Sequence, residues 1–195
     1  MYKLAQELET LPVRSMVKIG GKEQTVVASI TLQELYQQEG SSTWIPRGKH
    51  SRGLVLDHQQ LLLRLPQQEG GSYHWLQLQL VTAASSLREF YKGGDSLGEW
   101  GPARRFAKQQ QTGEVRYRLL DTDWYVRDIG TFQVDMEGES PICHHGDRLY
   151  FVTSHTPSAN EWLLYLDARP GEAQGTGGLF RGVPFIPSEL IEEVL

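Results

Sequence analysis

The chain has 195 residues, of which 39% are hydrophobic and 22% are charged, and its formal net charge is −5. This composition excludes an intrinsically disordered chain, and the length suits one sizeable core. The acidic balance disfavours a nucleic-acid-binding protein, which needs cations to neutralise phosphates. Five Trp, eight Tyr and six Phe supply large apolar side chains, so a packed core does not require disulfides.

Cysteine content and apolar patterning set expectations about the compartment. Cys143 is the single cysteine and cannot form an internal disulfide, which favours a reducing compartment. No apolar run approaches the ~18 residues of a membrane helix. The N-terminal segment carries acids and lacks the apolar stretch of a signal peptide. We therefore expect a cytoplasmic protein without membrane insertion.

Taken in chain order, the first elements are a helix and two hairpins. Leucines at three- to four-residue spacing predict a helix over the first ten residues. Residues 13–30 alternate with a period of two around Gly20-Gly21, which predicts a β-hairpin. The apolar runs 54–56 and 61–65 flank a short polar segment and predict a second hairpin.

The middle of the chain mixes strands with short helices. Residues 73–80 form the clearest strand pattern, with leucines on one face. Serine and proline start signals predict short helices over 85–91 and 102–111. Alternation resumes over 115–119.

The last third is again rich in strand patterns. Residues 131–136 predict one strand, and 147–153 and 160–166 predict a hairpin around a polar turn. Ser188 can cap a short C-terminal helix over 187–195.

Together these elements predict a mainly β fold, α+β by content. We expect antiparallel sheets packed as a sandwich or a partly closed barrel, with short N-terminal, central and C-terminal helices. Residues 1–195 are expected to form one compact domain, which could contain two related β units (about 12–82 and about 113–187). The evidence for duplication is that Leu61–Leu80 and Arg148–Asp167 reach Trp-Leu at the same offset, at Trp75 and Trp162.

The densest cluster of chemically capable residues is Cys143-His144-His145 with Asp147. Thiolate and imidazole groups are preferred zinc ligands, and a Cys–His pair can also act as a nucleophile. The spacing matches no closed zinc site and no cysteine-hydrolase signature. We therefore keep a zinc-binding protein or a hydrolase-type enzyme, centred on these four residues, as the alternative function.

A glycine-rich segment lies between Asp167 and Pro187. It has no regular periodicity, and loops of about 20 residues inside compact domains usually carry function. We expect an ordered loop with Phe180 and Phe185 packed on a sheet and the glycines at an exposed tip. The candidate ligand- or partner-binding residues in this segment are Arg169, Thr176, Gly177, Gly178 and Arg181.

These observations favour a non-catalytic accessory or binding module without a cofactor. It would recognise an unknown protein or small-molecule partner through its loops and through aromatic residues, which are enriched at binding hot spots. The candidate aromatic residues are Tyr73, Trp75, Tyr91, Trp100, Trp124 and Tyr125.

Overall fold

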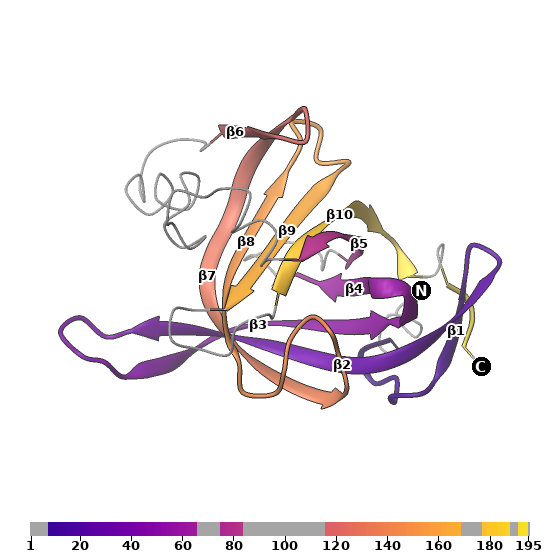
Figure 1. Cartoon of the computed structure of the whole chain (residues 1–195), viewed down its shortest axis with the longest axis horizontal. Helices are drawn as coiled ribbons and strands as arrows, with labels where there is room; N and C mark the ends of the chain where they lie inside the picture. The colour runs from indigo at the N-terminus through magenta and orange to yellow at the C-terminus, as the bar shows by residue number, and fades with distance from the viewer. Residues whose placement is uncertain (1–7, 66–74, 84–115, 169–176, 188–190, 195) are drawn as a thin grey trace.

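A computed structural model describes residues 8–65, 75–83, 116–168, 177–187 and 191–194 (Figure 1). Within this part of the chain, eleven strands join one sheet. The strands are β1 (Met16–Ile19), β2 (Lys22–Gln37), β3 (Trp44–Leu56), β4 (Gln60–Arg64), β5 (Trp75–Ala83), β6 (Arg116–Leu119), β7 (Thr122–Gly138), β8 (Arg148–His155), β9 (Trp162–Ala168), β10 (Gly177–Phe185) and β11 (Ile191–Val194). A short 3-10 turn, η1 (Asp57–Gln59), connects β3 to β4.

Eight of these strands close into an antiparallel barrel. The order β2-β3-β4-β5-β10-β9-β8-β7 returns to its start because β7 pairs with β2. Register shifts interrupt β2 between Val26 and Ala28 and β7 between Val126 and Asp128. Such bulges bend strands and increase their twist, which a closed barrel requires. The sequence therefore predicted the β class correctly, and the barrel is fully closed.

Alternation along the strands fills the barrel interior with apolar side chains. Phe132, Phe151, Trp162 and Phe180 share one buried cluster with leucines and valines of the neighbouring strands. The rings of Phe132 and Phe151 lie 4.5 Å apart between centroids. Because inward and outward positions alternate, the remaining apolar residues form two clusters outside the barrel, one around Trp124 and Tyr165 and one that includes Leu8, Leu54 and Trp75.

The predicted hairpins are confirmed, with one refinement. β1 pairs with β2, β3 with β4, and β8 with β9, each in antiparallel register. The strand predicted over 131–136 belongs to a longer strand, β7, whose two ends pair with different partners.

The structure does not support the predicted C-terminal helix and describes only part of the other predicted helices. The predicted C-terminal helix is wrong over Ile191–Val194, because these residues form β11 and pair with β1. Val17 is buried and pairs in register with Val194, and this long-range strand pairing overrides the local helix signal. Of the N-terminal helix, Leu8 and Glu9 are helical, and the central helices over 85–91 and 102–111 lie outside the described residues. No helix in the described ranges has both the length and the apolarity needed to span a membrane.

The functional loop predicted between Asp167 and Pro187 is also corrected. Its second half is β10, which lies between β5 and β9 in the barrel wall. Phe180 does pack, but into the barrel interior, and Phe185 packs outside it, 6.1 Å from Trp75 between ring centroids. The glycines of this segment, which led to the loop prediction, allow the backbones of the neighbouring strands to approach β10 closely. At Gly182, a Cβ atom would lie 1.8 Å from the carbonyl oxygen of Gln77.

The two halves of the barrel have the same strand order. β2–β5 and β7–β10 each follow one another in the sheet, and a short strand, β1 or β6, precedes each set. The two segments compared in the sequence are the hairpins β4–β5 and β8–β9, which do not occupy matching positions in this order. Trp75 also faces an outer cluster, whereas Trp162 lies in the interior cluster. The duplication therefore stays unconfirmed.

Candidate functional site

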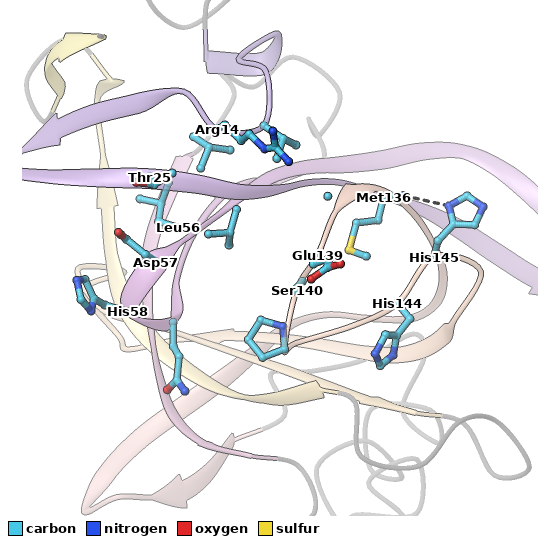
Figure 2. Close-up of a pocket in the computed structure, with 16 residues that line it drawn as sticks. Arg14, Thr25, Leu56, Asp57, His58, Met136, Glu139, Ser140, His144 and His145 are labelled. Atoms are coloured by element: carbon cyan, nitrogen blue, oxygen red, sulfur yellow. Dashed lines mark hydrogen bonds between the residues drawn. The ribbon is translucent and has the colours of Figure 1, made fainter.

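An open pocket lies at the end of the barrel where β2 begins and where β3 and β7 finish (Figure 2). We call it the end pocket. Its volume is about 1340 Å³. Its walls come from residues 13–14 before β1, from the start of β2, from the β3–β4 turn, and from the loop that follows β7. Segments far apart in sequence thus meet in one concave surface.

One part of the end pocket is apolar. Val26 and Leu56 are buried in the outer cluster that includes Leu8, Leu54 and Trp75, while Val27 and Met136 are partly exposed and pack against the interior cluster. Pro141 extends this wall. Ligand pockets in proteins have this kind of apolar lining with a few placed polar groups.

The polar groups of the end pocket come from several sides. Arg14 lies above it, Asp57 and His58 lie on one side, and His144 and His145 lie on the other (Figure 2). Glu139 and Ser140 lie between these two sides. The pocket therefore offers both hydrogen-bond donors and acceptors around an apolar wall.

Three non-glycine residues at this site have left-handed backbone conformations. Arg14 has φ 75°, His58 has φ 59° and Gln59 has φ 62°. The Arg14 N–H donates to the Val26 carbonyl at 2.8 Å, which ties residue 14 to β2. The pair His58–Gln59 forms the tight turn between β3 and β4, where two consecutive positive φ angles match the strand twist. Backbone strain of this kind concentrates at functional sites, although a hairpin turn alone can explain His58 and Gln59.

The 139–147 loop closes the barrel beside the end pocket. Ile142 and Cys143 belong to the interior cluster, so the loop is anchored from within. Outside, the His144 N–H donates to Asp147 Oδ2 at 2.7 Å, and the Asp147 N–H donates back to the His144 carbonyl at 3.2 Å. The Val134 N–H also donates to the Asp147 carbonyl at 2.9 Å, which joins the loop to β7. These hydrogen bonds hold the backbone of the loop in place, and His144 and His145 project from it.

Cys143 is fully buried and cannot serve as an accessible ligand or nucleophile in this conformation. Burial raises the pKa of its thiol to about 12, and the nearby Asp147 carboxylate adds to the rise. A nucleophilic or metal-binding cysteine needs the thiolate form. The fold therefore separates the thiol from the histidines of the predicted alternative centre. Cys143 belongs to the buried core, whereas the side chains of His144 and His145 are 65% and 69% exposed.

The two histidines have carboxylate neighbours rather than a thiolate. His144 Nδ1 lies 3.5 Å from Asp147 Oδ2, and His145 Nδ1 lies 3.2 Å from Asp135 Oδ1. His145 Nδ1 also accepts a hydrogen bond from the Met136 N–H at 3.3 Å. Across the described ranges, no group of three or more His, Cys, Asp or Glu residues has a metal-binding arrangement.

Of the five residues predicted to bind a partner in the glycine-rich segment, three lie in the part of the chain that the structure describes. Arg169 and Thr176 lie outside the described residues, and Gly177 and Gly178 are buried in β10. Arg181 binds the carboxylate of Glu161 with contacts of 2.9 and 3.0 Å, and its guanidinium lies 5.7 Å from the centre of the Trp124 ring. None of these three described residues, Gly177, Gly178 and Arg181, lines the end pocket.

Two of the six aromatic candidates are buried by packing. Trp75 and Trp124 are buried in the outer clusters, and Tyr125 is partly exposed and stacks on His155 at 6.4 Å. Tyr73, Tyr91 and Trp100 lie outside the described residues.

Sequence reasoning selected His144 and His145 but missed Arg14 and His58. His58 lies in a turn that the sequence did predict, whereas Arg14 lies in a turn where the sequence predicted a strand. No local pattern marks a turn that faces a distant loop. Comparisons of the chain with protein-family models, with curated proteins and with solved structures find no match.

Proposed function

We propose that the protein is a non-catalytic binding protein that holds a small amphipathic ligand in the end pocket. The observation that carries the proposal is the pocket itself, with an apolar wall and polar groups from several elements. The apolar part of the ligand would contact Val27, Met136 and Pro141. Its polar part would face Arg14 and the histidines.

The barrel interior is a less suitable place for a ligand. Four large aromatic side chains, those of Phe132, Phe151, Trp162 and Phe180, fill it together with aliphatic residues. Protein interiors packed in this way leave few voids larger than a water molecule. The end pocket lies outside this packed core, so a ligand could enter without unfolding the barrel.

Two features support a binding role over a catalytic one. The thiol of Cys143 is buried and held neutral, so the strongest nucleophile of the chain is withdrawn from solvent. His144 contacts the buried carboxylate of Asp147 and His145 contacts the exposed carboxylate of Asp135, and neither has a nucleophile beside it among the described contacts. The cytoplasm stays the expected compartment, since the single cysteine is a free thiol.

The proposal is tested with the neutral fluorescent probe phenylnaphthylamine. We expect saturable binding with one site per chain. Thr25 is partly exposed and lines the pocket, so Thr25→Phe should fill part of it and weaken binding by about tenfold or more. Thr122→Phe is the matched control, because Thr122 is also partly exposed but begins β7, far from the pocket at its other end.

Near-ultraviolet circular dichroism of both variants establishes that each is folded. Binding that is non-saturable, or that Thr25→Phe and Thr122→Phe affect equally, would contradict the proposal.

A further inference from the structure

Three of the five histidines in the described part of the chain line the end pocket. His58 comes from the β3–β4 turn, and His144 and His145 come from the 139–147 loop, so the fold brings together residues more than eighty positions apart. Figure 2 shows His58 on one side of the pocket and His144 and His145 on the other. Imidazole is the side chain that changes charge between about pH 5 and 8.

The fixed charges of the pocket lining nearly balance, so the histidines decide its sign. Among the described lining residues, Arg14 contributes one positive charge and Asp57 and Glu139 contribute two negative charges, which gives a formal charge of −1 with neutral imidazoles. Protonation of the three histidines changes this to +2. The pocket thus passes from repelling to attracting an anion as pH falls.

Two carboxylates that neighbour the histidines but do not line the pocket make its net charge more negative. They do not alter the direction in which that charge changes with pH. Asp147 contacts His144, and Asp135 contacts His145. The side chain of Asp135 is 77% exposed, so water screens its charge, while that of Asp147 is 10% exposed. Counting both carboxylates lowers the formal charge to −3 with neutral imidazoles and to zero with protonated ones. An anionic group is favoured by protonation in either count.

We infer that the end pocket captures the anionic head group of an amphipathic ligand at mildly acidic pH and releases it as pH rises. This inference rests on the proposed function and adds the charge of the ligand and its control by pH. Arg14 provides the constant positive charge, and the histidines provide the variable part. The apolar wall contributes equally at every pH, because its residues do not titrate.

Two probes of similar shape separate the inference from the proposal beneath it. Anilinonaphthalene sulfonate carries a permanent negative charge, and phenylnaphthylamine is its neutral counterpart. We expect the sulfonate to bind about tenfold more tightly at about pH 5.5 than at about pH 7.5. The neutral probe should bind equally at both values.

Variants then assign the effect to the three histidines. The triple variant His58→Gln, His144→Gln, His145→Gln should bind the sulfonate with the same affinity at both pH values. His50→Gln is the control, because His50 is exposed on β3 and does not line the pocket. It should keep the wild-type pH dependence.

The outcomes are distinguishable. Saturable binding of the neutral probe with a pH-independent affinity for the sulfonate would overturn this inference and leave the proposed function standing. A pH effect that persists in the triple variant would also overturn it. Failure of the neutral probe to bind at either pH would instead remove the proposed function.

Discussion

Gly182 in β10 offers the sharpest test of the barrel wall. The structure pairs Gly182 with Leu78 of β5 and with Trp162 of β9. A Cβ atom at position 182 would lie 1.8 Å from the carbonyl oxygen of Gln77 and 2.9 Å from the Cα atom of Leu78. Both neighbours are backbone atoms, so no rotation of a side chain can relieve the overlap. Gly182→Ala must push β5 and β10 apart.

The expected cost follows from this geometry. Overpacking a well-packed core by one methyl group costs ~1–3 kcal/mol, and more where backbone has to move. We therefore expect Gly182→Ala to lower the free energy of unfolding by at least about 3 kcal/mol. Urea denaturation followed by far-ultraviolet circular dichroism measures this change by linear extrapolation.

Gly48→Ala is the matched control, because Gly48 also lies in a strand but has no atom within 4 Å of an added Cβ. Its expected effect is within about 1 kcal/mol of zero. If the two variants had equal stability, residues 177–185 would not form a paired barrel strand, and the loop expected from the sequence would be restored.

Three further predictions concern stability and reactivity. The hydroxyl of Thr153 is fully buried without a hydrogen-bond partner, so Thr153→Val should raise the free energy of unfolding by about 1 kcal/mol in urea titrations, and a loss would mean that the hydroxyl is bonded. Because burial raises the pKa of Cys143 from 9.0 to about 12, the thiol of the folded protein should resist a thiol reagent at about pH 8. For the same reason, the free energy of unfolding should decrease, relative to that of Cys143→Ala, as pH rises from about 9 to about 12. Rapid stoichiometric labelling of the folded chain would contradict the raised pKa. The Arg181–Glu161 pair is partly exposed, so a double-mutant cycle with Arg181→Ala and Glu161→Ala should give a coupling below about 1 kcal/mol, and a larger value would show that Trp124 and the pair act together.

The β class could be predicted because it depends on local patterns. Alternation at Leu76 and Leu78 identifies the inward face of β5, and the same period identifies β2, β8 and β9. Short turns such as Gly20-Gly21 join neighbouring strands, so the hairpins followed as well. Burial of one face of a twisted sheet specifies this register directly from the sequence.

The pattern failed where long-range pairing overrode local preference. Glycine and proline are depleted in strands, so β10, with Gly177, Gly178, Gly182 and Pro184, resembled a loop. Its glycines are needed because strands β5 and β9 approach it closely, and that requirement appears only once the barrel is closed. The acidic segment Ile191–Val194 resembled a helix end but pairs with β1 for the same reason.

The candidate site shows the same division. The sequence by itself determined the residue types, one thiol and two adjacent histidines, and the turn at positions 57–60. Only the tertiary structure decided that Cys143 faces the core while His144 and His145 face the same pocket as Arg14 and His58. The physical reason is barrel closure. It brings the start of β2 beside the end of β7, and no local interaction along the chain encodes that contact.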